Sequence, residues 1–218
     1  MESFVSIYKN AISSDDCKII IDDINSSNLR QGTVSGVLNT EMKDLLVSPR
    51  NFTDQKPASM IIGNALYSYK EDYIKEHPQL NKIHKWDVDS LYNLQKYNPG
   101  QGYHISHCEN MGGRSLVRVL AWMIYLNTVN DKGTTSFDNY NIQTTAVEGS
   151  LLIWPAHWTH FHHGIVSPTE TKYIATGWCS YTDPILESML FALDNKKEEE
   201  YNDEEKKPFK KSFAEFKF

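Results

Sequence analysis

The sequence predicts a mainly β fold, a barrel or jelly roll with helices flanking it on the N-terminal and the C-terminal side. After Trp86 the chain is a series of short strand-like runs separated by turn signals such as Asn98-Pro99-Gly100 and Glu148-Gly149. Helical patterns of apolar residues occur only before and after this region. Regularly spaced short strands of this kind are typical of barrels and jelly rolls and argue against alternating βαβ units.

The N-terminal flank is expected to hold one short strand and two helices. Residues 4–8 alternate like a strand, and Ser13–Asp16 supply N-cap residues for an amphipathic helix that contains residues 17–24. A second helix is expected over residues 58–76, because Pro78 cannot continue it.

Seven strands are expected in the β region, over residues 91–97, 103–109, 116–126, 144–147, 150–154, 158–163 and 172–181. Residues 30–57 are polar and show no periodic pattern. Helical spacing returns after Asp183-Pro184, and a segment dense in Lys and Glu follows it. We therefore expect a single domain over residues 1–194, with a strand-rich core at about 86–181, and a charged C-terminal extension over residues 195–218.

The composition limits the partners that this chain is expected to have. Of its 218 residues 40% are hydrophobic, and its net charge of −6 argues against a general nucleic-acid binder with a basic face. No apolar run reaches the roughly 18 residues of a membrane helix, and the N-terminus lacks the pattern of a secretory signal. The three cysteines, Cys17, Cys108 and Cys179, lie far apart, which favours free thiols in a reducing compartment. We expect a soluble cytoplasmic protein that has no membrane partner and does not bind nucleic acid.

Histidines are concentrated in the β region, which holds His104, His107, His157, His160, His162 and His163. A lone histidine is more often a polar core or surface residue than a metal ligand, so the cluster matters only if a spacing rule also holds. One does: side chains alternate along a strand, so His107 and Glu109 share a face of the expected strand. With one more histidine they would form a facial triad that leaves three positions of an Fe(II) ion open, the arrangement of non-haem iron oxygenases.

The residues alone leave the third ligand of this triad open. Four histidines compete for the position: His157, His160, His162 and His163. On the strand expected over residues 158–163, His160 and His162 share a face, so alternation does not separate them.

Five segments of the β region carry a resemblance to a known family: Gln95–Gly100, His107-x-Glu109, Tyr125–Asn127, Gly133–Phe137 and Gly149–Pro155. Together they resemble the prolyl 4-hydroxylase-like branch of the 2-oxoglutarate/Fe(II)-dependent dioxygenase superfamily, over about residues 90–181. The resemblance implies a double-stranded β-helix, which is a jelly roll. It also implies Fe(II) as the metal, 2-oxoglutarate as cosubstrate and dioxygen as oxidant, and it leaves ascorbate as an optional reductant.

The resemblance also selects the distal histidine. In this family a basic residue that binds the far carboxylate of 2-oxoglutarate typically lies ten residues after that ligand. Lys172 stands at this spacing from His162. The other three histidines, His157, His160 and His163, are followed at this spacing by Ser167, Glu170 and Tyr173, which carry no cation.

The resemblance thus implies His107, Glu109 and His162 as metal ligands and catalytic residues, and Lys172 and Tyr97 as residues that bind 2-oxoglutarate. Glu109 departs from the family, most of whose members have aspartate at this place. Glutamate is longer by one methylene group and can still coordinate a metal.

The expected function is hydroxylation of a protein, peptide or small-molecule substrate, with peptidyl proline as the favourite by analogy. Two alternatives remain at the level of the sequence: a cupin-like metal-binding isomerase or hydrolase, and a non-catalytic jelly-roll binding module. Fold resemblance alone does not fix the substrate, and the sequence predicts no oligomeric state.

Overall fold

A computed structural model describes residues 2–33, 38–183 and 188. The chain divides into two units, Met1–Tyr181 and Thr182–Phe218, and every helix and strand named below belongs to the first. The helical pattern expected after Asp183-Pro184 and the charged extension over residues 195–218 lie outside the described residues. In the described part of the chain, no helix combines the length and the apolar character needed to cross a membrane.

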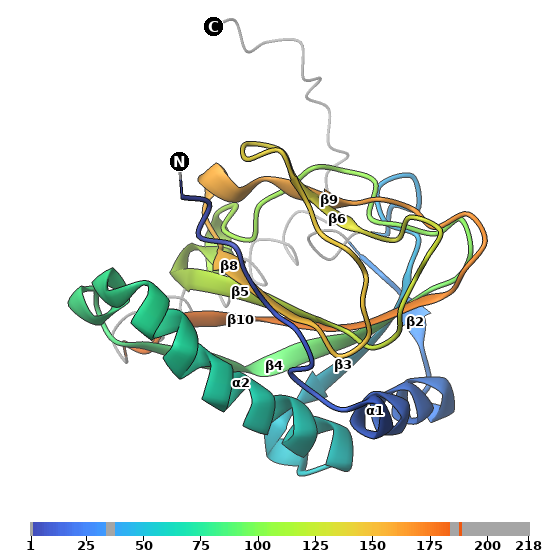
Figure 1. The fold of residues 1–218 in the computed structure, drawn as a ribbon, viewed down its shortest axis with the longest axis horizontal. Helices are drawn as coiled ribbons and strands as arrows, with labels where there is room; N and C mark the ends of the chain where they lie inside the picture. The colour runs from blue at the N-terminus through green and yellow to red at the C-terminus, as the bar shows by residue number, and fades with distance from the viewer. Residues whose placement is uncertain (1, 34–37, 184–187, 189–218) are drawn as a thin grey trace, which may run out of the picture. The chain divides into compact units, whose positions relative to one another are not determined.

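Two antiparallel sheets face each other in this unit, as the predicted jelly roll requires (Figure 1). The larger sheet has the strand order β1-β8-β5-β10-β4-β3-β2 and the smaller has the order β7-β6-β9. The larger sheet is made of β1 (Ser6–Tyr8), β2 (Arg30–Gln31), β3 (Leu46–Asn51), β4 (Trp86–Tyr97), β5 (Arg118–Tyr125), β8 (Leu151–Pro155) and β10 (Lys172–Tyr181). The smaller sheet is made of β6 (Thr135–Phe137), β7 (Ile142–Gln143) and β9 (His162–Gly164).

Two helices flank the larger sheet, close to where the sequence predicts them. Helix α1 (Ser14–Ser26) begins with a capping box, in which the Ser13 hydroxyl accepts from the Asp16 amide and the Asp16 carboxylate accepts from the Ser13 amide. Helix α2 (Pro57–Glu76) begins with a proline at its first position and ends before Pro78. Four short 3₁₀ helices complete the unit: η1 (Phe52–Asp54), η2 (Pro78–Lys82), η3 (Gly113–Val117) and η4 (Trp158–His160).

The central strands of the larger sheet are buried on both faces, and their side chains alternate between two hydrophobic clusters. In β5, Leu120, Trp122 and Ile124 pack in the cluster that includes the buried faces of α1 and α2. The intervening Met123 and Tyr125 pack in the other cluster, with residues of β6 and β8. The helices therefore close one face of the sheet, and polar groups of a site can gather only on the other.

Strands β4, β5, β8 and β10 confirm four of the expected runs, but three others differ from the prediction. Residues 103–109 form no continuous strand, because their backbone pairs with different partners in turn: Tyr103 with Lys43, and His107 with His162. Residues 144–147 form no strand, and within them the Val147 amide donates to the Thr145 carbonyl at 3.0 Å.

The expected strand over residues 158–163 is also wrong in its first half. A hydrogen bond from the His160 amide to the His157 carbonyl winds this part into η4, and only His162–Gly164 is extended. Residues 30–57, which show no pattern in the sequence, supply β2 and β3 at one edge of the larger sheet.

Candidate active site

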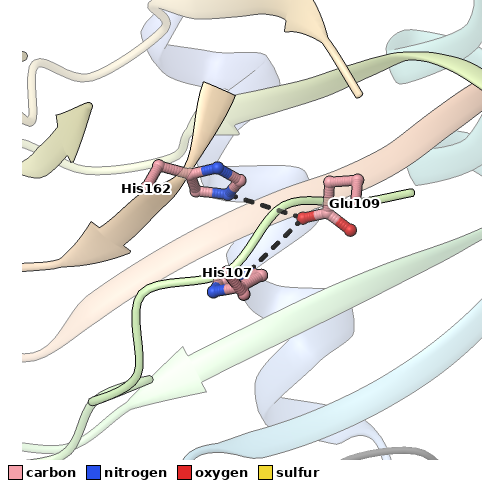
Figure 2. Close-up of side chains that lie close together, drawn as sticks. All are labelled: His107, Glu109 and His162. Carbon is pink, nitrogen blue, oxygen red and sulfur yellow. Dashed lines mark ion pairs between the residues drawn. The ribbon is translucent and has the colours of Figure 1, made fainter. Parts of the chain in front are cut away.

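His107, Glu109 and His162 meet in the structure, each offering one ligand atom, and all three atoms lie within 4.8 Å of one another. The Glu109 Oε1 is 3.6 Å from the His107 Nε2 and 3.5 Å from the His162 Nε2 (Figure 2). Both histidines are buried and Glu109 is largely covered. Two imidazoles and one carboxylate that face a common point are the donor set of the facial triad.

The backbone fixes the two histidines relative to each other. The His107 amide donates to the His162 carbonyl at 2.9 Å, and the His162 amide donates to the His107 carbonyl at 2.8 Å. This reciprocal pair is one rung of an antiparallel ladder, and the side chains of such a rung point to the same side. The two imidazoles therefore face the site together, although residue 107 is not part of a regular strand.

Hydrogen bonds also fix the orientation of both imidazoles. The Nδ1 of His107 contacts the Ile105 carbonyl and the Nδ1 of His162 contacts the His160 carbonyl, both at 2.9 Å. A carbonyl only accepts, so each Nδ1 carries the proton and the Nε2 of each neutral ring keeps a lone pair for a metal. The donor set thus fits an Fe(II) ion in both the kind and the direction of its atoms.

The carboxylate of Glu109 is held from several sides. Its Oε2 accepts a hydrogen bond of 2.7 Å from the indole Nε1 of Trp178. The Arg118 Nη1 donates to the Glu109 carbonyl at 2.9 Å and lies 3.6 Å from Oε2, and the guanidinium stacks 3.7 Å from the Trp178 ring. Burial raises the pKa of the Glu109 carboxyl, but when His107 and His162 carry a second proton on Nε2, their hydrogen bonds and charges outweigh burial and hold this pKa well below its usual range.

The histidines that compete with His162 in the sequence point elsewhere. The Nε2 of His160 donates to the Ser3 carbonyl at 2.8 Å, because η4 turns this residue away from the face of His162. His163 pairs with Asp138 at 3.0 Å, on the opposite side of the strand from His162. The third competitor, His157, contacts Asn110, and His104, which is not a candidate for the third ligand, contacts Asp44. The structure brings only His162 to His107 and Glu109 among the described histidines.

Lys172 is a buried cation, with 7% of its surface exposed. Its ammonium group donates to the Gly133 carbonyl at 3.3 Å and lies 4.5 Å from the centre of the Tyr97 ring. No carboxylate of the described residues forms an ion pair with it, and burial lowers its pKa to about 8. An unpaired buried cation is costly, so this position favours an anionic ligand.

Tyr97 lies beside Lys172, but through its ring rather than through its hydroxyl group. The hydroxyl donates to the Gln95 side chain at 2.6 Å, and the ring face covers the ammonium group of Lys172. The two residues pair across β4 and β10, which explains their proximity.

The sequence pattern assigns no specific role to four residues that lie at the site: Lys43, Tyr103, Arg118 and Trp178. Strand alternation offers a signal for Trp178, since it lies on the same face of β10 as Lys172. Tyr103 stacks on His107, with ring centres 3.9 Å apart. Nothing in the sequence pattern marks Lys43, which lies in the segment without periodicity.

Residues 92–180 match the model of the 2OG-Fe(II) oxygenase superfamily. This segment, which carries His107, Glu109, His162 and Lys172, is similar to that superfamily. Oxygenases of this superfamily use Fe(II), 2-oxoglutarate and dioxygen, and the site described above fits the metal. No curated protein sequence matches the chain.

Solved structures of prolyl hydroxylases share the fold. A viral collagen prolyl hydroxylase from Paramecium Bursaria Chlorella virus-1, in complex with 2OG, has a TM-score of 0.61 at 14% identity and covers 82% of this chain and 97% of its own. A Pseudomonas putida prolyl-4-hydroxylase has a TM-score of 0.64 at 14% identity, with coverage of 82% and 93%.

A third structure is a prolyl hydroxylase from Trichoplax adhaerens in complex with a peptide fragment of the hypoxia inducible factor oxygen degradation domain. It has a TM-score of 0.65 at 16% identity and covers 82% of this chain and 84% of its own. At these identities the likeness shows the fold and confirms the jelly roll.

Proposed function

We propose that this oxygenase holds Fe(II) with His107, Glu109 and His162 and hydroxylates a peptide substrate. The observation that carries the proposal is the convergence of the two free Nε2 atoms and the Glu109 Oε1 within 4.8 Å. Bound Fe(II) supplies the oxidative chemistry, in which decarboxylation of 2-oxoglutarate to succinate and carbon dioxide accompanies insertion of oxygen into a C–H bond of the substrate.

Lys172 is the residue that we assign to the far carboxylate of 2-oxoglutarate. It is a buried cation without a carboxylate partner among the described residues, and a dicarboxylate would supply the missing negative charge. Tyr97 supports Lys172 through its ring, while the role of its hydroxyl group is to hold Gln95.

Peptidyl proline is the substrate that we propose first, by analogy with the prolyl hydroxylases that share the fold. One of these structures contains a peptide fragment of a hypoxia inducible factor. A cytoplasmic location is part of the proposal, and three free, buried cysteines support it, because such thiols are typical of a reducing compartment.

The test is turnover of 2-oxoglutarate by the purified protein with Fe(II), with and without a panel of proline-containing peptides. We expect succinate to form, and a peptide substrate to gain the mass of one oxygen atom. Protein that binds neither Fe(II) nor 2-oxoglutarate would contradict the proposal.

A matched set of histidine variants tests the placement of the metal. His107→Ala and His162→Ala should lose Fe(II) binding in a metal titration, because each removes one of the converging ligand atoms. His163→Ala is the control, since its side chain neighbours His162 in sequence but pairs with Asp138. His160→Ala should also keep the metal, and its failure to bind Fe(II) would mean that the distal ligand is wrongly assigned.

A further inference from the structure

Lys43 is a second cation beside the metal ligands, and the backbone holds it firmly in place. It precedes β3 and forms an isolated antiparallel bridge with Tyr103. The His104 amide donates to the Met42 carbonyl at 2.9 Å, and the Asp44 amide donates to the Gly102 carbonyl at 3.2 Å. The residues on both sides of Lys43 are thus tied to the segment that leads into His107.

The side chain of Lys43 reaches towards the site. Its aliphatic stem passes over Gly32, where an added Cβ would lie 3.1 Å from the lysine Cε. Its ammonium group lies 4.9 Å from the centre of the Tyr103 ring, and this ring stacks on His107 at 3.9 Å. Burial lowers the pKa of Lys43, while the charge of Glu109 raises it, so the ammonium is within electrostatic range of that metal ligand.

The ammonium of Lys43 forms no ion pair with a carboxylate among the described residues. The adjacent Asp44 is engaged elsewhere, because its Oδ1 accepts from the Gly102 amide at 2.6 Å and contacts the His104 Nε2 at 3.2 Å. Glu109 lies beyond ion-pair distance of Lys43 and is already shared between two imidazoles and Trp178.

The charges of the loaded site leave Lys43 without a partner. The two positive charges of Fe(II) and the one of Lys172 would be balanced by Glu109 and by the two carboxylates of 2-oxoglutarate. Arg118 has contacts of its own with Glu109 and Trp178. A half-buried positive charge next to the metal ligands therefore remains for a group that is neither metal nor cosubstrate.

We propose that Lys43 binds a carboxylate of the substrate, and that it makes this oxygenase selective for substrates that carry a carboxylate near the oxidised C–H bond. The proposal rests on the proposed function, since it places a substrate at the same metal site. The carboxylate comes either from an acidic side chain of a peptide or from the free carboxyl group of a small molecule.

Binding of matched acid and amide probes tests the proposal without turnover. Protein loaded with Mn(II) and 2-oxoglutarate under anaerobic conditions is titrated with two probe pairs. L-proline against L-prolinamide reports on a free carboxyl group, and the peptide Ala-Glu-Pro-Ala against Ala-Gln-Pro-Ala reports on an acidic side chain. We expect at least one acid to bind about 10- to 100-fold more tightly than its amide, and Lys43→Met to abolish that difference.

Lys96→Met is the matched control. The Lys96 ammonium also lies over a tyrosine ring, that of Tyr173 at 5.5 Å, but on the helix-covered side of the sheet, where it binds Asn25. This variant should keep the acid preference in full. Lys43→Arg keeps the positive charge and should keep most of the preference, which separates loss of charge from loss of folding.

Equal binding of acid and amide in both pairs, including no binding of either, overturns the proposal. A loss of 2-oxoglutarate affinity in Lys43→Met that is as large as the loss of acid preference also overturns it, since Lys43 would then bind the cosubstrate. The affinity for 2-oxoglutarate is measured first in the same samples, so failure of the proposed function would appear there, before any probe is added.

Discussion

Trp178 donates a hydrogen bond of 2.7 Å from its indole Nε1 to the Oε2 of Glu109, the oxygen that does not face the two histidines. The carboxylate is thereby divided between two tasks. Oε1 faces the proposed position of the metal, and Oε2 is anchored to β10. A glutamate has one more rotatable bond than an aspartate, and this anchor removes the freedom that the extra bond would give.

Trp178→Phe should weaken metal binding without unfolding the protein. The phenyl ring keeps most of the packing against Arg118 but cannot donate to Glu109. We expect Fe(II) affinity to fall about 10- to 100-fold, the range in which loss of one outer hydrogen-bond partner commonly changes metal affinity. A competitive metal titration measures it, and unchanged affinity would mean that the hydrogen bond does not position the carboxylate.

Glu109→Asp should fail to restore the site, although aspartate is the usual residue of the family. Shortening the side chain by one methylene group moves the carboxylate away from both His107 and His162, or else breaks its bond to Trp178. We expect a loss of Fe(II) affinity of about tenfold or more. Calorimetric titration with Fe(II) under anaerobic conditions checks this, with Glu109→Gln as the charge-removing comparison. An aspartate variant that binds as tightly as the wild type would show that the backbone can adjust.

Lys172→Met should change ligand binding and stability in opposite directions. The variant loses the cation that we assign to 2-oxoglutarate, so 2-oxoglutarate affinity should fall about 100-fold, in line with the 2–5 kcal/mol cost of truncating a buried charged pair. The ligand-free variant should be more stable by about 1–3 kcal/mol, because an unpaired buried charge is removed. Urea unfolding and ligand titration together measure both effects. Fe(II) binding should stay near the wild-type level, and its loss would contradict the placement of Lys172.

The pH dependence of 2-oxoglutarate binding should follow Lys172. Its pKa of about 8 is lowered by burial, and the dicarboxylate prefers the protonated form. Affinity should therefore be constant below pH 8 and should fall about tenfold per pH unit above it. Lys172→Arg provides the control, because a guanidinium stays charged throughout this range. An identical pH profile in both proteins would assign the titration to another group.

Lys172 should also affect stability as the pH rises. Its pKa in the folded protein is lower than the value of about 10.4 for an exposed lysine, so the unfolded chain binds more protons between the two values. The ligand-free wild type should therefore gain stability between pH 8 and pH 10 relative to Lys172→Met. If the free energy of unfolding changes with pH in the same way in both proteins, this prediction is contradicted.

Gly177→Ala should destabilise the sheet beside Trp178. A Cβ at residue 177 would lie 2.5 Å from the Trp122 Cζ2, a distance that a buried ring cannot relieve by rotating in place. We expect a loss of about 1–3 kcal/mol in the free energy of unfolding. Gly63→Ala is the control. Gly63 lies within helix α2, and its added Cβ would be 3.6 Å from the nearest atom of Phe52, which is ordinary contact. This variant should therefore be neutral or stabilised by up to about 1 kcal/mol. Urea titration distinguishes the two.

The sequence predicts His107 and Glu109 as neighbours in space for a reason that is only partly right. Alternation along a strand places them on one face, but the structure has no continuous strand there. The reciprocal hydrogen bonds between His107 and His162 hold the histidine in place, and the Glu109 amide bonds to the Ala156 carbonyl at 3.0 Å. The side chains of His107 and Glu109 converge because His162 and Ala156 fix the backbone at these two residues in turn.

His162 could be predicted only through the ten-residue spacing to Lys172. The alternation that equated it with His160 does not hold, because a 3₁₀ turn changes the direction of the chain between the two. Short turns of this kind depend on one hydrogen bond and leave little trace in a hydrophobic pattern.

Lys43 could not be predicted at all. It lies next to β3, which contains Pro49, and the neighbouring edge strand β2 has only two residues. An edge strand this short carries no reliable periodicity. The place of β3 in the sheet is set by its pairing with β4, which a sequence pattern does not express.

The reciprocal backbone bonds between His107 and His162 have a consequence for iron supply in the cell. The two proposed ligands are joined through hydrogen bonds between their own main chains, so their spacing does not depend on a bound metal. Removal of iron by a chelator should leave the amide hydrogens of both residues protected from exchange with solvent. Recovery after iron starvation would then be limited by the arrival of new metal, and not by any slow refolding of the protein.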